Sequence, residues 1–394
     1  MMPSLESYTA VETLQQMDGQ QLTHIVSRAL SEPVTLAQWH VTLLGGLNSS
    51  PMAGGVYKLS GTAVTANHTP KKWCVVVKIL RSPEGMTMPD GTYITREMAE
   101  DRNHFGYWQR ERLVAESGLL DELPAGLTAP RFLGTTHQTE TECWLWQTCL
   151  GADDKWKWAE YREAAYRLGQ WQARGQAAHT DHTWLSQNWM AGWVHGPLAG
   201  IFGIVEGMNG YQHPLLSAHF APKELDTVRQ LWADRQSYLD RLADLPQTLC
   251  HLDAHRGNLC WQGEKLALFD WAFVGTGAVG EELAAFIGAT LLLDYLSVDE
   301  AEKLEQAAFA GYTAGLRAAG WQGDEALIWE AYRLVLALRY APASISSMLR
   351  TDLQPEFAAE WEAQTGKPLR EILAHRAELV RFYLSRLPLE EQVV

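Results

Sequence analysis

The stretch CHLDAHRGNLCW, residues 250–261, carries the highest density of chemically active side chains in the chain. His251, Asp253 and His255 alternate, so a strand would place all three on one face, where they could ligate a transition metal. Asp253 and Asn258, five positions apart, fit a different arrangement, in which one loop handles a proton and binds a divalent cation. The rest of the sequence decides between these two interpretations.

The transition-metal interpretation lacks further ligands. A His-x-Asp-x-His cluster needs further ligands to close a site, usually another histidine downstream. After His255 the sequence has one more histidine, His375, near the C-terminus and about 120 residues away. Gly257 interrupts a strand through this stretch, and Arg256 would bring a positive charge next to the cation. A metal-dependent hydrolase that uses the three alternating residues is therefore kept only as an alternative.

Composition and charge narrow the class of protein. The chain has 394 residues, enough for two domains or lobes, and its 46% of hydrophobic residues is typical of a folded soluble protein. The net charge of −15 disfavours nucleic acid and anionic membranes as partners, because both require a basic surface. The longest apolar run, residues 283–293, is too short to span a bilayer.

The five cysteines are scattered along the chain, and no Cys-x-x-Cys pair occurs. Their spacing indicates neither a disulfide framework nor a zinc knuckle, and it favours a reducing setting. The first residues, MMPSLESYTAVETLQQ, lack the basic start and the apolar stretch of a signal peptide. From these observations we expect a cytoplasmic protein.

The hydrophobic pattern predicts a strand-rich part at the start of the chain. Three strands are predicted between about residues 36 and 80, followed by one helix from about residue 105 to 117. Two further strands are predicted over residues 129–138 and 143–151. The expected order is therefore three strands, one helix and two strands.

The second part of the chain is dominated by long amphipathic helices. Two short extended pieces, QTLCHLD (residues 247–253) and KLALFDW (residues 265–271), lie between helices and suggest a small hairpin. We therefore expect a strand-rich N-terminal lobe over residues 1–147, with a leading helical segment 1–32. A mainly helical lobe is expected over residues 148–394.

A loop that binds magnesium needs a carboxylate near Asn258, and Asp270 meets this need. Asp270 ends an apolar run in which Leu266, Leu268 and Asp270 share one face of a strand. A charge that projects from a buried face is costly unless a partner such as a metal ion offsets it. The sequence therefore predicts Mg²⁺ as a cofactor, with Asn258 and Asp270 as its ligands.

A loop that accepts a proton and binds magnesium is what phosphoryl transfer requires, and this reaction also needs a cationic side chain on the phosphates. Lys78 lies in WCVVVKIL, residues 73–80, and is the only charge on the strand face that it shares with Cys74, Val76 and Leu80. On the helix that follows, Glu111 lies on the half-buried side and is the candidate ion-pair partner of Lys78. Glu97 and Glu116 are alternative partners.

A glycine-rich stretch, LLGGLNSSPMAGG (residues 43–55), lies between the first two predicted strands. Its glycines permit close approach of the backbone to phosphates, and Ser49 and Ser50 are candidate hydrogen-bond donors. The stretch matches neither the Walker pattern nor Gly-x-Gly-x-x-Gly, so it is weaker evidence than the loop around Asp253.

Four segments in chain order resemble the motifs of the aminoglycoside phosphotransferase and choline kinase superfamily: VVVKIL (75–80), RERLVAESGLL (110–120), HLDAHRGNL (251–259) and LFDWAFVGTGAVGEELA (268–284). The resemblance covers roughly residues 40–300 and is strongest over residues 250–285. It implies an α+β, bilobal fold similar to that of protein kinases. In such a fold a small N-terminal antiparallel sheet with one main helix precedes a larger, mainly helical lobe.

The resemblance also implies the roles of individual residues. Asp253 would be the catalytic base, and His251 would support the loop that carries it. Lys78 would contact the phosphates of ATP, or of GTP, with Glu111 as its partner. The segment WQTCL looks like the hinge that binds adenine through backbone hydrogen bonds, which makes Gln147 and Cys149 cofactor-binding candidates.

Two positions depart from the family pattern. Leu252 stands where the family has glycine, and Glu281 or Glu282 replaces the aspartate that follows the metal motif. The acceptor is expected to be a hydroxyl on a small molecule, because no activation-segment-like stretch lies between Asp270 and the next helix. A nucleotide-binding regulator of the same fold without catalysis remains an alternative, as does transfer of a nucleotidyl group.

Overall fold

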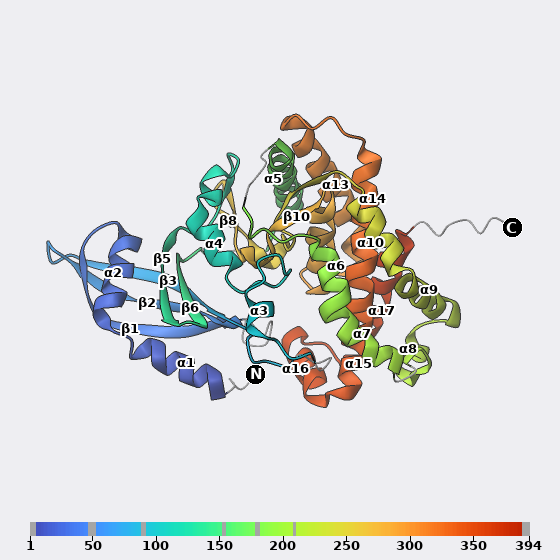
Figure 1. Ribbon diagram of the computed structural model, residues 1–394, viewed down its shortest axis with the longest axis horizontal. Helices are drawn as coiled ribbons and strands as arrows, with labels where there is room; N and C mark the ends of the chain where they lie inside the picture. Colours follow the sequence, from blue (N-terminus) through green and yellow to red (C-terminus); the bar gives the residue numbers. More distant parts are fainter. Residues whose placement is uncertain are drawn as a thin grey trace.

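The computed structural model describes residues 5–45, 53–87, 92–151, 155–177, 182–207 and 210–387. The large antiparallel sheet and the first two helices lie at one end of the molecule, and most of the other helices lie at the other end together with the small sheets (Figure 1). The strands are β1 (Val34–Gly45), β2 (Ala53–Thr65), β3 (Pro70–Arg81), β4 (Leu127–Thr128), β5 (Phe132–Thr139), β6 (Glu142–Thr148), β7 (Gln247–Cys250), β8 (Leu259–Gln262), β9 (Lys265–Leu268) and β10 (Gly275–Ala278).

The α-helices begin before the first strand and continue to the end of the described chain. They are α1 (Leu5–Gln15), α2 (Gly19–Leu30), α3 (Arg96–Ala99), α4 (Arg110–Ser117), α5 (Trp158–Ala177), α6 (Trp189–Trp193), α7 (Ala199–Gly207), α8 (Pro214–His219), α9 (Pro222–Ala233), α10 (Arg235–Ala243), α11 (Glu281–Ala284), α12 (Thr290–Leu292), α13 (Ala301–Ala318), α14 (Glu325–Val335), α15 (Ala341–Leu353), α16 (Pro355–Thr365) and α17 (Leu369–Ser385). Within the described ranges, every helix is too short or too polar to cross a membrane.

The first part of the chain forms one antiparallel sheet in the order β1-β2-β3-β6-β5. All five strands lie where the sequence predicts them, and the α+β fold class is confirmed. In β3 the side chains of Val75, Val77 and Ile79 are buried against the α1–α2 side of the sheet. Because side chains alternate along a strand, Lys78 points from the opposite face. The apolar packing of β3 thus fixes the direction of its lysine.

The predicted helix over residues 105–117 begins later than expected, at Arg110. The preceding segment cannot continue the helix, because its carbonyl groups are used elsewhere. Those of Arg102, His104 and Phe105 accept hydrogen bonds from the guanidinium group of Arg110.

The predicted pairing between residues 247–253 and 265–271 is wrong. Instead, β7 pairs antiparallel with β10, and β8 and β9 form a hairpin of their own. The β8–β9 turn is two residues long and contains Gly263 at φ 65°, a conformation that glycine adopts at little cost. Consequently residues 251–258 form a separate loop between β7 and β8.

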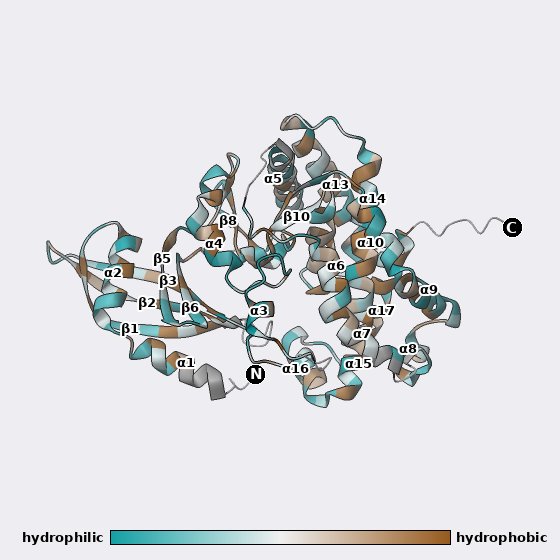
Figure 2. Cartoon of the chain, in the orientation of Figure 1, coloured by the Kyte–Doolittle hydropathy of each residue, from teal (hydrophilic) through white to brown (hydrophobic). Residues whose placement is uncertain are grey.

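The helical part is assembled around α5 and α13, which lie side by side. The helices carry hydrophobic residues among hydrophilic ones (Figure 2), as expected for helices with one buried face. Three glycines let the two backbones approach: a Cβ atom at Gly311, Gly315 or Gly169 would overlap a main-chain carbonyl oxygen of the other helix. Close packing of α5 against α13 therefore depends on having glycine, which has no side chain, at these three positions.

We expect Gly315→Ala to destabilise the fold by about 1–3 kcal/mol, because the added methyl group must push α5 and α13 apart. Thermal and urea unfolding measure the change. Gly203→Ala is the matched control, since a Cβ at that position of α7 meets no atom within 4 Å. The control should be neutral or stabilising by up to about 1 kcal/mol. Equal stability of the two variants would contradict the packing argument.

Candidate active site

The loop between β7 and β8 is held in a strained conformation at Leu252. Its φ of 67° lies in the left-handed region, which costs a residue other than glycine about 1–2 kcal/mol. The N–H of Leu252 donates to Oε1 of Glu282 at 2.9 Å, and its carbonyl oxygen accepts from Nη1 of Arg339 at 2.9 Å. Polar contacts on both sides thus hold leucine where the family pattern has glycine, and Glu282 is the glutamate that braces the loop.

His251 supports the loop from beneath and is completely buried. Its Nδ1 accepts the N–H of Asp253 at 3.3 Å, so the proton resides on Nε2, which lies 3.1 Å from the carbonyl oxygen of Phe269. Burial lowers the pKa of His251 to about 4, so the ring is neutral at pH 7. His251 therefore links the loop to the strand that precedes Asp270.

The carboxylate of Asp253 is held by two donors, one on each oxygen. Oδ1 accepts from Nη2 of Arg339 at 2.7 Å, and Oδ2 accepts from Nδ2 of Asn258 at 2.9 Å. Burial favours the neutral acid, but the nearby His255 and Arg339 outweigh it and lower the pKa of Asp253 well below its ordinary value. Asp253 is therefore an oriented carboxylate at neutral pH.

The two histidines beside Asp253 do not form a metal site with it. Both ring nitrogens of His251 are engaged by backbone groups of Asp253 and Phe269. Nδ1 of His255 accepts the N–H of Gly257 at 3.0 Å, and its Nε2 faces Oδ2 of Asp253 at 3.6 Å. In the described part of the chain, no group of three or more His, Cys, Asp or Glu side chains is placed to hold a metal ion.

Lys78 lies between two carboxylates from distant parts of the chain. Its Nζ is 2.6 Å from Oε2 of Glu111 on α4 and 2.5 Å from Oδ1 of Asp270. The ion pair with Glu111 is the one that the sequence favoured over Glu97 and Glu116. Burial disfavours the charged lysine, but the two carboxylates outweigh it and raise the pKa of Lys78 above its ordinary value. Burial raises the pKa of Glu111, although Lys78 opposes this shift.

Two side chains of the site offer oxygen atoms of the kind that bind magnesium, Asp270 and Asn258. Asp270, with φ 62°, follows β9, and its side chain is 42% exposed. Oδ1 contacts Lys78, and Oδ2 has no partner among the described residues. Asn258 uses Nδ2 for its two hydrogen bonds to Asp253, which leaves its amide oxygen available. A carboxylate and an amide oxygen are ligands that Mg²⁺ prefers.

Arg110, which was not predicted from the sequence, joins the parts of the site. It is fully buried, and its five N–H contacts all go to carbonyl oxygens, including those of Trp184 and Ala272 at 2.9 and 3.1 Å. Burial lowers the pKa of Arg110 to about 10, so it stays charged at pH 7. Backbone acceptors leave no pattern in a sequence, so only its position next to Glu111 could have drawn attention.

Two of the expected nucleotide-binding residues lie at the end of β6. Gln147 is buried in the strand, and Cys149 follows it and forms a disulfide with Cys74 of β3. The expectation of no disulfide is therefore wrong: β3 and β6 are neighbours, and the register Val75–Thr148 brings the two cysteines together. The support that cysteine spacing gave to a reducing setting is removed as well.

Ser49 and Ser50, the candidate donors of the glycine-rich stretch, lie outside the described residues.

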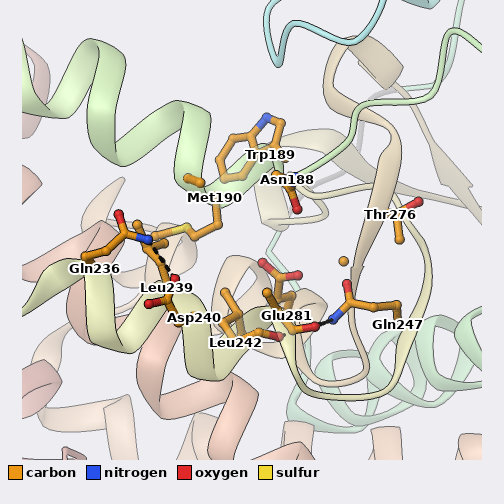
Figure 3. A pocket seen from close by; sticks show the side chains of 13 residues that line it. Asn188, Trp189, Met190, Gln236, Leu239, Asp240, Leu242, Gln247, Thr276 and Glu281 are labelled. Carbon is orange, nitrogen blue, oxygen red and sulfur yellow. Dashed lines mark hydrogen bonds between the residues drawn. The ribbon is translucent and has the colours of Figure 1, made fainter.

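A cavity of about 250 Å³ lies between α6, α10 and the β7–β10 pair (Figure 3). Glu281 lines it with one carboxylate oxygen bound to the N–H of Ala278 at 2.5 Å, and Trp189 forms another part of its wall.

Burial raises the pKa of Glu281 from 4.5 to about 7, which predicts a loss of stability as pH rises. Between pH 4.5 and about pH 7 this carboxyl group is ionised in the unfolded chain but still protonated in the folded protein. The free energy of unfolding therefore falls by up to about 3 kcal/mol over this range because of this group. Glu281→Gln should remove this part of the fall between pH 5 and pH 8, as measured by urea unfolding. Glu302→Gln, at an exposed carboxylate of α13, controls for the lost charge. An unchanged pH dependence in Glu281→Gln would contradict the assignment.

The chain is similar to several solved kinase and phosphotransferase structures, whereas no curated protein sequence matches it. One is spectinomycin phosphotransferase APH(9)-Ia in complex with ADP and spectinomycin, with 13% identity, 95% of this chain and 100% of that chain covered, and a TM-score of 0.49. Another is amicoumacin kinase hAmiN, with 11% identity, 84% and 89% covered, and a TM-score of 0.47. A third is a choline/ethanolamine kinase family protein from Mesorhizobium loti, with 12% identity, 96% and 100% covered, and a TM-score of 0.46.

The family of the chain is assigned from a match to a protein-family model. The model described as the phosphotransferase enzyme family matches residues 89–327, more than half of the chain. The match includes α4, the loop between β7 and β8, and the segment around Asp270. The protein therefore belongs to the phosphotransferase enzyme family.

Proposed function

We propose that the protein transfers the γ-phosphate of ATP to a hydroxyl group of a small molecule, with Asp253 as the catalytic base. The observation that carries this proposal is the state of the Asp253 carboxylate, which is half-buried, ionised at neutral pH and held on both oxygens. A base of this kind accepts the proton of the acceptor hydroxyl as the oxygen attacks phosphorus. Its orientation supplies the positioning that dominates catalysis of phosphoryl transfer.

The remaining residues fit the binding of a magnesium nucleotide. Lys78 carries its charge at the point where β3, α4 and the Asp270 segment meet, and it can donate to phosphate oxygens. Asn258 and Asp270 would hold Mg²⁺, which neutralises negative charge on the phosphates during transfer. Backbone groups around Gln147 and Cys149 are the proposed contact to the base of ATP, or of GTP.

The alternatives receive less support. A regulator without catalysis has no need to retain Lys78, Asp253, Asn258 and Asp270 together, and the contacts of Lys78 with Asp270 and of Asn258 with Asp253 support a catalytic role. A hydrolase based on the histidines lacks free ring nitrogens at His251. Transfer of a nucleotidyl group uses the same residue types, and the mass of the product distinguishes it from phosphate transfer.

The proposal is tested by a screen of Mg-ATP consumption with candidate acceptors: aminoglycosides, macrolides, amino alcohols, sugars and nucleosides. We expect one class to stimulate consumption and to gain the mass of one phosphoryl group. Asp253→Asn should then lower kcat by about 10²–10⁴-fold while Mg-ADP still binds, because the base acts in the transition state. Near-normal turnover of Asp253→Asn with a confirmed acceptor would rule out the assigned base.

Asp270 is expected to act differently, because its role is to hold the cation. Asp270→Ala should weaken ADP binding in the presence of Mg²⁺ by about tenfold or more and lower the rate as well. Calorimetric titrations with Mg²⁺ and with EDTA measure this change, and the wild-type difference between the two conditions should shrink. Asp299→Ala, at an exposed aspartate, is the control. If Mg²⁺ strengthens ADP binding by Asp270→Ala as much as it does for the wild type, Asp270 is not a ligand.

A further inference from the structure

Arg339 reaches the catalytic loop from a distant part of the chain. It lies in the π-helical turn η8 (Leu336–Tyr340), which joins α14 to α15, and only 8% of it is exposed. A π-helical turn redirects side chains relative to a regular helix and is frequent at functional sites. Here it lies where the guanidinium group meets residues 252 and 253.

The two nitrogens of the guanidinium fork bind two different groups of the loop. Nη1 donates to the carbonyl oxygen of Leu252 at 2.9 Å, and Nη2 donates to Oδ1 of Asp253 at 2.7 Å. The fork thus fixes the strained backbone and the carboxylate at the same time. Because Asn258 binds Oδ2 from its own side, the carboxylate cannot rotate without breaking a hydrogen bond.

Aromatic rings on α6 hold the guanidinium group in place. The Cζ atom of Arg339 lies 4.5 Å from the ring centre of Trp189 and 5.7 Å from that of Trp193. The two indoles stack with 5.6 Å between ring centres and an interplanar angle of 9°. Arginine suits this position because its planar group stacks on aromatic faces and donates through its edge.

We propose that Arg339 is a positioning residue for phosphoryl transfer, which orients the carboxylate of Asp253 toward the acceptor hydroxyl and fixes the backbone at Leu252. This inference rests on the proposed function, because it takes Asp253 as the base. Arg339 lies outside the catalytic loop, the metal motif and the strand that carries Lys78. A small displacement of a reacting group costs about 10²-fold in rate, so losing Arg339 should act on turnover more than on nucleotide binding.

The chain offers a matched control for a purely structural role. Arg376 of α17 is 3% exposed, donates to Oδ2 of Asp294 at 2.9 Å, and lies 4.8 Å from the ring centre of Trp361. It therefore makes the same kinds of contact as Arg339, with a carboxylate and an indole, but not with the catalytic loop. Arg376→Met reports what the loss of such an arginine does to folding alone.

The test is a double-mutant cycle with Arg339→Met and Asp253→Asn, using the acceptor found by the screen. For each protein we measure kcat, KM for the acceptor, the affinity for Mg-ADP and the melting temperature. If Arg339 acts through Asp253, Arg339→Met should lower kcat about 10²-fold in the wild-type background. In the Asp253→Asn background it should lower kcat by no more than about threefold, because the oriented group is already lost. Mg-ADP affinity should stay within about twofold.

The control and conservative variants separate positioning from stability. Arg376→Met should lower the melting temperature and leave kcat within about twofold. Arg339→Lys keeps the charge but loses the fork, so its kcat should lie between those of wild type and Arg339→Met. If Arg339→Met does not fold, the cycle is completed with Arg339→Lys, whose loss should likewise vanish in the Asp253→Asn background.

The possible failures point to different errors. A wild-type protein that transfers no phosphoryl group to any acceptor class would overturn the proposed function, and the inference with it. Wild-type transfer together with equal losses from Arg339→Met in both backgrounds would overturn the inference alone. The same holds if Arg339→Met keeps kcat within about threefold of wild type.

Discussion

The ionic contact of Lys78 with Glu111 and Asp270 is the interaction on which the site depends. It joins β3, α4 and the segment after β9, which are far apart in the sequence. One positive charge between two carboxylates leaves an excess of negative charge in a partly buried place, and a divalent cation is the species that would balance it. The same three residues therefore hold the two parts of the molecule in register and leave an excess negative charge, which fits the proposed metal nucleotide.

The second constraint is the backbone at Leu252, whose left-handed conformation costs free energy for a residue other than glycine. Glu282 binds its N–H and Arg339 its carbonyl oxygen, while His251 supports the next residue from beneath. These side chains come from a loop, a helix start and a π-helical turn. Together their contacts hold Leu252 in a conformation that glycine would adopt at little cost. The result is a rigid loop that presents Asp253 in one orientation.

Periodicity and residue chemistry were enough to predict the small sheet and the ion pair of the site. The five strands, the direction of Lys78 and its pairing with Glu111 all result from side-chain alternation and half-buried helix faces. Arg110 could not be found in this way, because its acceptors are backbone carbonyl oxygens, which every residue has. Arg339 could not be found either, because the two residues that it binds lie 87 and 86 positions away in the sequence. The Cys74–Cys149 disulfide and the β7–β10 pairing depend on register between distant segments, which local patterns do not contain.

A protein with a net charge of −15 must still attract a polyanionic nucleotide if it is to use one. Long-range attraction cannot help, because the average field of the protein repels anions. Because the two carboxylates outweigh the charge of Lys78, the uncompensated short-range positive charge is that of the fully buried Arg110, which donates to the carbonyl oxygen of Ala272 in the segment after Asp270. Arg110 has only carbonyl dipoles as hydrogen-bond acceptors, so its full charge is not cancelled by a paired carboxylate. Binding of magnesium reduces the negative charge of the nucleotide. An acidic protein therefore repels the metal nucleotide less than the free nucleotide.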